Sequence, residues 1–467
     1  MSYSSERIFH TSPSFTMASF LSSRPALRSL ARFRSFSASL ALAVAAAGFL
    51  APFLPLACHA QEKLQSGDLV AICGDSITEG KVYSLYMADY LVMCQPATNL
   101  QAFQAGWSGE RAPGFLGRMK TNVLDFSPTV ATTCYGMNDG GYSASTAENT
   151  ATYKQAMQAI VKKFKEGGVR FIVVGAPGAV DTKSFKRDKT TAEVYNQTLA
   201  TLGAAAREVA AEEGVTFADV HGIMADVMAR AKEKKGPGYL VGGSDGVHPG
   251  HNGHLIMAYA FLKALGCDGN IGTITIDMKA ATGEATGEGH KVLASSGDRT
   301  TIESTRYPFC FPPPKDGQPV DQQSSSTILE FLPFHQDLNR YMLVVKNPPA
   351  GLRGLKVTWG EKSKNFSVED LAKGVNLAAE FPDNPFCQQW SVVHRALQQQ
   401  QQMETLGIKD LTNSLKNFAR LMPGDAEAIG ALERLVAKVP ARLKELREKS
   451  SAQVIPIKHS IVLEPGH

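Results

Sequence analysis

The stretch from Asp68 to about Leu265 alternates short apolar runs with longer amphipathic segments, and no other feature restricts the fold as much. The apolar runs predict strands over 68–73, 99–103, 129–134, 169–174 and 215–218. The segments between them predict helices, the clearest of which span 146–166, 191–213 and 249–265. Strands that alternate with helices are typical of β-α-β units. The sequence therefore predicts an α/β domain with a parallel sheet, whose functional site lies in loops at the carboxyl ends of the strands.

The N-terminal stretch has a pattern of its own. Arginines precede an uncharged apolar segment over about 40–57, and small residues follow as far as Ala60. This order is typical of a secretory signal peptide, so we expect cleavage after Ala60 and an exported protein, periplasmic or extracellular. A transmembrane anchor is the alternative, because the apolar segment approaches the length that spans a bilayer. Lipoprotein anchoring at Cys58 is disfavoured, because Pro55-Leu56-Ala57 is a poor context for it.

Past Gly266 the sequence changes character twice. Short β-prone runs, broken by prolines and polar stretches, predict a β-rich region and lie at 272–278, 327–331, 340–345 and 355–359. Apolar periodicity then predicts a helical hairpin over 390–406 and 425–449, with Pro440 inside the second helix. The five consecutive glutamines at 398–402 are expected on a solvated helical face. The expected parts are a signal peptide (1–60), an α/β domain (61–268), a β-rich accessory region (269–385) and a helical region (386–467).

Charge and cysteine content exclude several classes of protein. The formal net charge of the chain is +4, and residues 1–60 hold five Arg and one Glu, also +4, so the chain after residue 60 is neutral. No basic field for nucleic acid or for an anionic membrane remains. The cysteines after residue 60 are widely spaced without a C-x-x-C pair, which argues against a zinc knuckle or a disulfide-stapled miniprotein. Cys73 and Cys134 lie in apolar runs and are expected to be buried thiols.

A Gly74-Asp75-Ser76 turn ends the first predicted strand. Such a turn can project a hydroxyl at the end of the strand, so Ser76 is a candidate nucleophile, although a serine here can also be a helix cap. Three further polar stretches lie in predicted loops, at 106–110, 135–139 and 244–249. Each is an ordinary loop on its own. Together they contain the residue types that an acyl-transfer site requires.

Serine is a weak nucleophile, so it needs an imidazole to accept its proton and a carboxylate to orient that imidazole. His248 and Asp245, three residues apart, can supply both groups to Ser76. The tetrahedral intermediate also needs donors aimed at its oxyanion. The backbone N–H of Gly109, the side-chain amide of Asn138 and the N–H of Ser76 itself would serve. Asp75 is expected to be structural.

The blocks Gly74-Asp75-Ser76-Ile77, Gly106-x-x-Gly109, Gly136-x-Asn138-Asp139 and Asp245-x-x-His248-Pro249 stand in the order found in the SGNH hydrolases, the GDSL-type esterases and lipases. The sequence resembles this family over about 70–265. The resemblance implies a flavodoxin-like three-layer α/β/α sandwich and a catalytic role for domain 61–268. It implies Ser76 as nucleophile, His248 as base and Asp245 as its orienting acid, with Ser76, Gly109 and Asn138 as the oxyanion hole. No metal and no organic cofactor is implied.

Two departures from the family pattern touch no catalytic role. Ile77 replaces the Leu of the GDSL name, and Gln104 stands where many members have Asn. The stretch lacks a G-x-S-x-G elbow, which argues against the α/β-hydrolase fold.

Other acid and histidine groupings have simpler explanations. His248, His251 and His254 recur every third residue and could be imagined as metal ligands, but Pro249, Gly250 and Gly253 disrupt the helix that would align them. Asp219 and His221 form a second acid–histidine pair, for which capping of a helix by Asp219 is the favoured explanation.

The function that we expect is an exported serine esterase that removes small acyl groups, most readily acetyl, from carbohydrate. A lipase or lysophospholipase is the alternative enzyme, and an apolar stripe of Trp107, Phe115, Leu116 and Met119 would favour it. A carbohydrate-binding protein with a vestigial catalytic core is the alternative from another class. The expected partner is a small ester or an acylated carbohydrate, with no nucleic acid and no stable membrane insertion after the signal peptide is removed.

Overall fold

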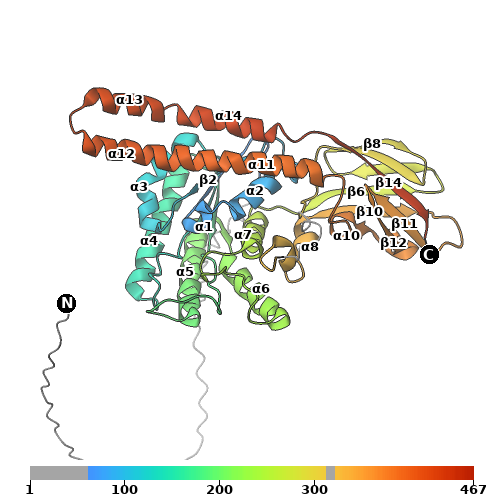
Figure 1. Ribbon diagram of the computed structural model, residues 1–467, viewed down its shortest axis with the longest axis horizontal. Helices are drawn as coiled ribbons and strands as arrows, with labels where there is room; N and C mark the ends of the chain where they lie inside the picture. The colour runs from blue at the N-terminus through green and yellow to red at the C-terminus, as the bar shows by residue number, and fades with distance from the viewer. Residues whose placement is uncertain (1–61, 312–320, 467) are drawn as a thin grey trace, which may run out of the picture. The chain divides into compact units, whose positions relative to one another are not determined.

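A five-stranded parallel sheet is the centre of the first part of the chain (Figure 1). The computed structural model describes residues 62–311 and 321–466, so the predicted signal peptide lies outside the described residues. The strands of this sheet are β1 (Leu69–Gly74), β2 (Gln101–Gly106), β3 (Val130–Cys134), β4 (Phe171–Gly175) and β5 (Thr216–Ala218). Their order is β2-β1-β3-β4-β5, which is the flavodoxin-like order. Each predicted strand is confirmed to within two or three residues at its ends.

Helices cover both faces of this sheet, and side chains alternate between the two layers along each strand. On β1, Val70 and Ile72 face one layer, whereas Ala71 and Cys73 face the other. The first layer contains α2 (Tyr83–Met93), α6 (Val220–Lys235) and α7 (His251–Ala264), and the second contains α3 (Ala112–Asn122), α4 (Ala147–Glu166) and most of the buried face of α5 (Ala192–Glu212). The predicted three-layer α/β/α sandwich is therefore confirmed. Cys73 and Cys134 are buried free thiols, as expected.

The β-rich region contains two sheets. One has the order β13-β10-β6-β7 and the other β12-β11-β14-β9-β8. The strands are β6 (Asn270–Asp277), β7 (Thr282–Thr286), β8 (His290–Ser295), β9 (Arg299–Ser304), β10 (Arg340–Lys346), β11 (Gly354–Trp359), β12 (Lys362–Ser367), β13 (Val375–Asn376) and β14 (Ile457–Pro465). Short helices accompany them: η2 (Ser325–Ile328), α8 (Phe334–Leu338), α9 (Val368–Lys373) and α10 (Leu377–Glu380). Tyr341 and Trp359 stack at 5.5 Å between ring centroids in the core of this region.

Two expectations for this part of the chain were wrong. Residues 327–331 were expected to be β-prone, but they lie in η2 and the turn after it, where Ile328 is buried. The region after 386 was expected to be helical, yet its last segment is β14, which lies between β9 and β11. Apolar residues alternate in β14, but alternation along one strand does not show which distant strands it pairs with.

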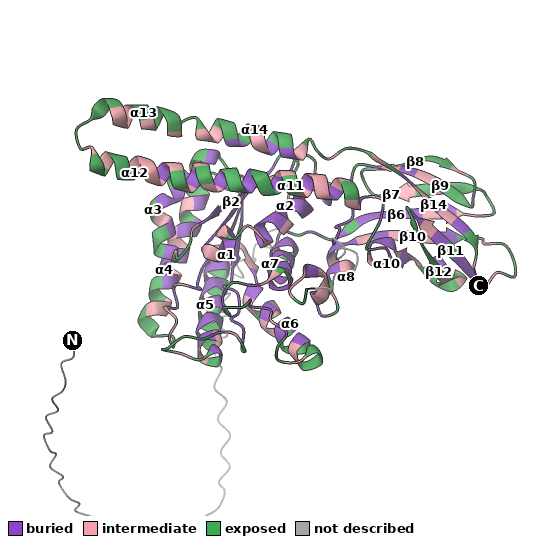
Figure 2. Ribbon diagram, in the orientation of Figure 1, coloured by how far each residue is buried: buried purple, intermediate pink, exposed green. Residues whose placement is uncertain are grey.

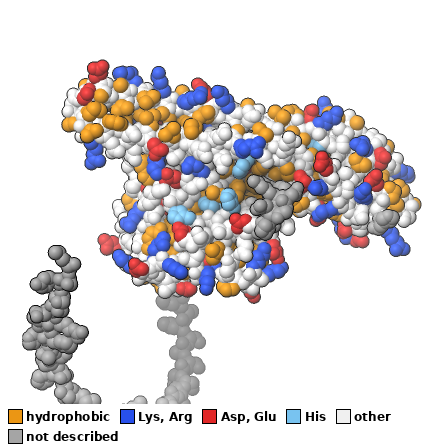
Figure 3. All heavy atoms as spheres, viewed as in Figure 1, with side chains coloured by type: hydrophobic (Ala, Val, Ile, Leu, Met, Phe, Trp, Pro, Cys, Tyr) orange, Lys and Arg blue, Asp and Glu red, His pale blue; other side chains and the backbone are white. Residues whose placement is uncertain are grey.

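The predicted helical hairpin is confirmed, and its two arms are interrupted. The first arm runs from α11 (Cys387–Glu404) through a π-helical segment (Thr405–Leu411) into α12 (Thr412–Leu421). The second arm is divided into α13 (Ala426–Val436) and α14 (Val439–Ser451). Pro440 lies in the first turn of α14, where the backbone N–H that proline lacks would have no partner within the helix. Apolar side chains are exposed on α12 and α13, among them Phe418 and Leu435 (Figures 2 and 3).

α11 covers the outer edge of β2, which is an edge strand of the parallel sheet. The Gln400 amide donates to the Ala102 carbonyl at 2.9 Å, and the Glu404 carboxylate accepts from the Gln104 N–H at 3.1 Å. Polar side chains therefore occupy backbone groups that would otherwise be open to another strand. The glutamine tract was expected to be solvated throughout, but Gln400 and Gln401 are buried. The correction arises because an edge strand offers buried partners to polar side chains.

Glu404 makes the attachment of α11 sensitive to pH. Burial raises the pKa of its carboxyl to about 8, although Arg447 and the hydrogen bonds from Gln104 and Gln400 oppose the shift. A folded state that holds this proton more tightly than the unfolded state loses stability as pH rises from the ordinary carboxyl range towards 8. We expect the melting temperature to fall by about 2 °C per pH unit between pH 5 and 8 through this group.

Differential scanning calorimetry of Glu404→Gln at several pH values tests this expectation. The variant removes the titration while keeping an acceptor for Gln104, so its melting temperature should fall less steeply than that of the wild type. Asp75 and Asp139, whose carboxyls burial also shifts upward in pKa, leave a residual slope. The exposed Glu427→Gln on α13 is the control. Identical slopes for wild type and Glu404→Gln would contradict the assignment.

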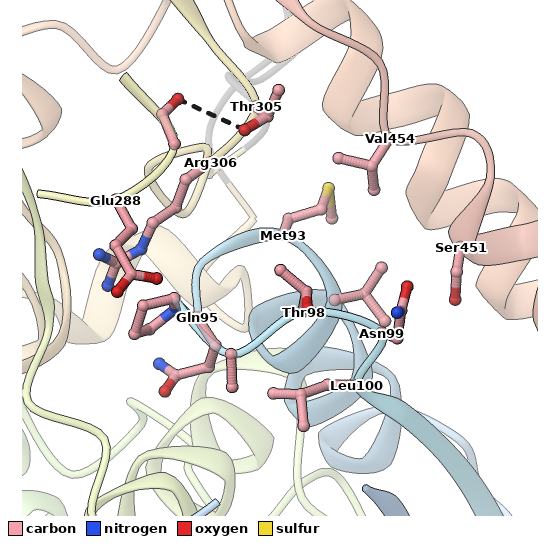
Figure 4. Close-up of a pocket in the computed structure, with 14 residues that line it drawn as sticks. Met93, Gln95, Thr98, Asn99, Leu100, Glu288, Thr305, Arg306, Ser451 and Val454 are labelled. Atoms are coloured by element: carbon pink, nitrogen blue, oxygen red, sulfur yellow. Dashed lines mark hydrogen bonds between the residues drawn. The ribbon is translucent and has the colours of Figure 1, made fainter. Parts of the chain in front are cut away.

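A cavity of about 390 Å³ lies where the three parts of the chain meet (Figure 4). Three segments line the cavity. They are the loop before β2, which contains Thr98, the residues flanking β8 and β9, which include Thr305, and the end of α14 with the residues just after it, which include Val454. Nε of Arg306 donates to the Cys94 carbonyl at 2.6 Å and joins the β-rich region to the α/β domain. This cavity is at the amino end of β2, opposite the carboxyl ends where the predicted site lies. Within the described residues, no helix combines the length and apolarity needed to cross a bilayer.

Candidate active site

Ser76 is the first residue of α1 (Ser76–Glu79), the short helix that follows β1. Asp75 caps this helix, because its Oδ1 accepts from the N–H of Ile77 at 3.0 Å. The end of β2 packs directly on α1: a side-chain Cβ at Gly106 would lie 2.2 Å from the backbone nitrogen of Glu79. A glycine is therefore required at 106 for the two segments to approach. Ser76 is thereby held at the carboxyl edge of the sheet.

The structure brings Ser76, His248 and Asp245 together. Ser76 Oγ lies 2.8 Å from Nε2 of His248, and Nδ1 of His248 lies 2.7 Å from Oδ2 of Asp245. The other oxygen of Asp245 accepts from the N–H groups of Val247 and His248, each at 2.9 Å. Burial opposes the charge on Asp245, but the hydrogen bonds from His248 outweigh it and lower the pKa of this carboxyl. The arrangement can transfer a proton from the serine hydroxyl to an imidazole of fixed orientation.

Asp181 holds the loop that carries Asp245 and His248. Its buried carboxylate accepts from the N–H groups of Val241 and Gly242 at 2.9 and 3.2 Å and from Lys232 at 2.7 Å. Burial opposes its charge, yet these donors lower the pKa of Asp181. Sequence reasoning missed this residue, since an aspartate after a strand has no distinctive neighbours in the chain.

Of the three expected oxyanion-hole residues, Ser76 begins α1, and Gly109 and Asn138 lie in two loops beside it. Gly109 has a φ of +73°, a left-handed conformation that favours glycine. The Asn138 amide donates to the Glu110 carbonyl at 3.1 Å, and its Oδ1 accepts from the Tyr142 hydroxyl at 3.4 Å. These contacts orient the amide nitrogen of Asn138 towards the loop that contains Gly109.

The loop from Trp107 to Arg111 is fastened by side chains that sequence reasoning did not single out. Arg118 forms a buried double hydrogen bond with Glu110, at 2.7 and 2.5 Å. Glu79 accepts from both the N–H and the Oγ of Ser108, at 2.5 and 2.6 Å, and Lys409 of the π-helical segment binds Glu79 at 2.6 Å. Lys409, from the C-terminal helical arm, therefore contacts the carboxylate that holds the 107–111 loop in place.

Two buried carboxyls stabilise the loops around Ser76. Burial is the main cause that raises the pKa of Asp75 to about 7 and that of Asp139 to about 6. Asp139 accepts from the N–H groups of Ala112 and Gly136 at 2.9 and 3.0 Å, which joins the loop after β3 to α3. Both carboxyls are engaged with backbone donors, whereas Asp245 is the one that binds His248.

The other candidates from the sequence have separate surroundings. Nδ1 of His251 is 2.8 Å from the Tyr86 hydroxyl, and His254 is buried against Tyr83. Asp219 caps α6, as predicted, by accepting from the Gly222 N–H at 3.0 Å. Phe115 and Met119 of the proposed apolar stripe are buried in the core, so they do not form an exposed lipid-binding surface.

Comparisons with known proteins agree with this geometry. Residues 72–256 match the model of the GDSL-like Lipase/Acylhydrolase family. The chain therefore contains a domain of this family, which confirms the resemblance, and the protein is a carboxylic ester hydrolase. A comparison with curated protein sequences gives no match.

Several solved structures are similar to this chain. BT4096, a gut microbial diltiazem-metabolizing enzyme, has 22% sequence identity and a TM-score of 0.65, with 87% of this chain and 99% of that chain covered. Axe2, an acetylxylan esterase from Geobacillus stearothermophilus, has 22% identity and a TM-score of 0.37, with 44% and 97% covered. A putative GDSL-like lipase from Parabacteroides merdae has 22% identity and a TM-score of 0.38, with 44% and 99% covered. The first likeness shows that the fold recurs well beyond the family domain.

Proposed function

We propose that the protein is a serine esterase in which Ser76, His248 and Asp245 form the catalytic triad. The observation that carries this proposal is the continuous hydrogen-bonded chain from Ser76 Oγ through His248 to Asp245, at 2.8 and 2.7 Å. Ser76 Oγ attacks the ester carbonyl carbon while Nε2 of His248 takes the hydroxyl proton. The carbonyl oxygen becomes an oxyanion, for which the N–H groups of Ser76 and Gly109 and the Asn138 amide are the donors.

The second half of the reaction regenerates the serine. The tetrahedral intermediate collapses, the bond to the alcohol oxygen breaks, and His248 returns its proton to that oxygen. Water then gives a proton to His248 and attacks the acyl-enzyme carbonyl. A second collapse breaks the bond to Ser76 Oγ, which takes the proton back as the carboxylic acid leaves.

We propose further that the acyl group is small, most readily acetyl, and that the alcohol is a carbohydrate. An aromatic wall supports the small acyl group: Tyr142, whose hydroxyl binds Asn138, stacks on Tyr195 at 5.0 Å between ring centroids. Phe185 continues this wall, 5.6 Å from Tyr195, and its backbone packs against Gly246 in the loop of His248. Tyr195 and Phe185 are buried behind the partly exposed Tyr142, so they fix the Tyr142 ring beside Asn138. A fixed ring at this position supports the proposal that the site accepts only a short acyl chain.

The proposed setting is outside the cytoplasm. The arginine-rich, apolar and small-residue order of residues 1–60 supports an exported enzyme, and the neutral charge of the remaining chain suits a neutral polymer. Mass spectrometry of the protein recovered from its native host would test export by locating the N-terminus. Cleavage after Ala60 is expected, and an uncut chain would contradict it.

Graded substrates test the acyl preference. We expect kcat/KM for p-nitrophenyl acetate to exceed that for the octanoate at least about tenfold, because each methylene that does not fit loses its favourable burial. Acetate release from acetylated xylan and pectin, measured by coupled assay, tests the alcohol. A rate that rises steadily from acetate to octanoate would contradict the proposal and favour the lipase alternative. Absence of hydrolysis with every ester would favour the vestigial binding protein.

A further inference from the structure

A second cavity, of about 670 Å³, lies between α2 and α11 beside the proposed triad. Gly80 lines one part of it, and the N–H of Gly80 donates to the carbonyl oxygen of Ser76 at 2.9 Å. His251 lines it as well and follows His248 by three residues. Gly80 ends the single turn of α1 that Ser76 begins, and His251 begins α7 three residues after His248, so the cavity starts a few residues along the chain from both the nucleophile and its base. Histidine side chains gather on this face of the molecule (Figure 3).

A buried carboxylate orients a partly exposed imidazole in this cavity. Asp89 on α2 is 1% exposed, and its Oδ2 lies 2.7 Å from Nδ1 of His394 on α11. The His394 side chain is 30% exposed. Oδ1 of Asp89 has no hydrogen-bond partner among the described residues. A buried carboxylate oxygen without a hydrogen bond costs free energy of folding. This cost points to a bound molecule that donates a hydrogen bond to Asp89.

α11 presents a row of side chains along the cavity. Trp390, His394, Gln398 and Gln402 are spaced by four residues, and all four line the cavity. This spacing places side chains on one face of a helix. The glutamine amides carry donors and acceptors together, and Trp390 adds an aromatic surface. Such a mixture suits a ligand with many hydroxyl groups and an apolar ring face.

The charges that line the cavity favour one class of ligand over others. The cavity is lined by two aspartates, Asp89 and Asp321, against Lys81 and His394, so an ionised His394 would balance the set. Burial disfavours the charge on both partners and raises the pKa of Asp89. At His394 the charge and hydrogen bond of Asp89 outweigh burial, so the pKa of this imidazole is raised and its ionised form is favoured. A neutral ligand is therefore favoured over an ionic one. An acyl chain would bury the Asp89–His394 pair against hydrocarbon, which is unfavourable.

We propose that this cavity is a sugar-binding subsite for the alcohol side of the ester, in which Asp89 and His394 hold neighbouring hydroxyl groups. The inference rests on the proposed carbohydrate esterase function and names the residues that would recognise its substrate. One wall of the subsite comes from α11, so the C-terminal helical arm determines which alcohols reach Ser76. The volume of about 670 Å³ falls within the range of about 300–1,000 Å³ usual for small-molecule sites.

Kinetics on two acetyl esters test the subsite. The measured quantity is the ratio of kcat/KM for acetylated xylo-oligosaccharide to kcat/KM for p-nitrophenyl acetate, in wild type, Asp89→Asn and His394→Gln. We expect both variants to lower this ratio about tenfold, through a higher KM for the oligosaccharide. Gln399→Ala, on the same helix but outside the cavity, is the control and should keep the wild-type ratio. Unchanged ratios in both variants, or equal losses on both esters, would overturn the subsite.

Direct binding separates this inference from the proposed function. Calorimetry with unacetylated xylo-oligosaccharide and the Ser76→Ala protein measures occupancy of the subsite without turnover. We expect binding that His394→Gln weakens about tenfold, with a melting temperature that shows the variant is folded. No binding by the Ser76→Ala protein would overturn the subsite even if the wild type is an active esterase. Binding that persists when the wild type cleaves no ester would instead contradict the esterase and leave the subsite supported.

Discussion

Replacing Ser76 by Ala is expected to lower kcat on p-nitrophenyl acetate by at least about 10⁴-fold, because the attacking oxygen is lost while the donors for the oxyanion stay in place. Ser76 Oγ is the atom that His248 Nε2 contacts at 2.8 Å, and no other hydroxyl is expected to replace it. Steady-state kinetics with the purified protein measure the loss. Ser145→Ala, at an exposed position in the loop before α4, is the matched control. More than a tenth of the wild-type rate in Ser76→Ala would refute the nucleophile.

The triad also makes a prediction about how variants combine. Groups that act as one unit lose most of their effect when any one of them is removed. A Ser76→Ala/His248→Ala double variant should therefore be no slower than the slower single variant, within about threefold. Losses that multiply across the two positions would show that the residues act independently.

A labelling experiment identifies the nucleophile directly. Treatment with a fluorophosphonate followed by peptide mass spectrometry should show modification of Ser76 in the wild type.

Local pattern was sufficient to predict the α/β domain and the positions of its polar loops. A buried strand such as 130–134 is an apolar run bounded by turn residues, and both signals lie within a few positions of each other. The carboxyl ends of parallel strands meet at one edge of the sheet, so loops far apart in sequence converge there. That geometry explains why the sequence alone could predict that Ser76 and Asn138 lie close together.

Contacts between distant polar side chains could not be predicted in this way. The sequence predicts a polar helical face at Gln400 and Gln401. It does not show that Gln400 donates to the backbone of β2 or that Gln401 accepts from Ser84. Asp181 and Glu404 are similar, because their partners are backbone N–H groups brought close by tertiary structure. A buried polar residue is stabilised by whatever partner it finds, and that partner leaves no mark in the neighbouring sequence.

The C-terminal arm has a contact of this kind that reaches the active site. Lys409 lies 2.6 Å from Oε1 of Glu79, and Oε2 of Glu79 holds both the N–H and the Oγ of Ser108. Burial opposes the charge on Glu79, but the hydrogen bonds from Lys409 and Ser108 outweigh it and lower the pKa of this carboxyl. Glu79 is on the helix of Ser76, and Ser108 precedes Gly109. We therefore expect Lys409 to act as a positioning residue for both the proposed nucleophile Ser76 and the proposed oxyanion donor Gly109.

Lys409→Met is expected to lower kcat on p-nitrophenyl acetate between about 10- and 100-fold while KM changes less than about threefold. The variant keeps much of the side-chain volume but leaves the Glu79 carboxylate without its cation, so the clamp on Ser108 loosens. A misplaced Gly109 N–H affects the oxyanion that forms in the transition state more than the bound ester. Lys409→Arg, which retains the charge, should restore at least about a third of the wild-type kcat. Lys444→Met, exposed on α14, is the control.

A structural role alone for Lys409 would give a different set of results. It would lower the melting temperature of Lys409→Met and leave kcat per folded molecule close to that of the wild type, as judged by active-site titration with a fluorophosphonate. In the positioning role, Glu79→Gln and Lys409→Met should not be additive, because both release the same Ser108 contact. Losses in kcat that multiply in the double variant would mean that Glu79 and Lys409 act on the site separately. Glu79 would then hold Ser108 near the helix of Ser76 whether or not Lys409 is present.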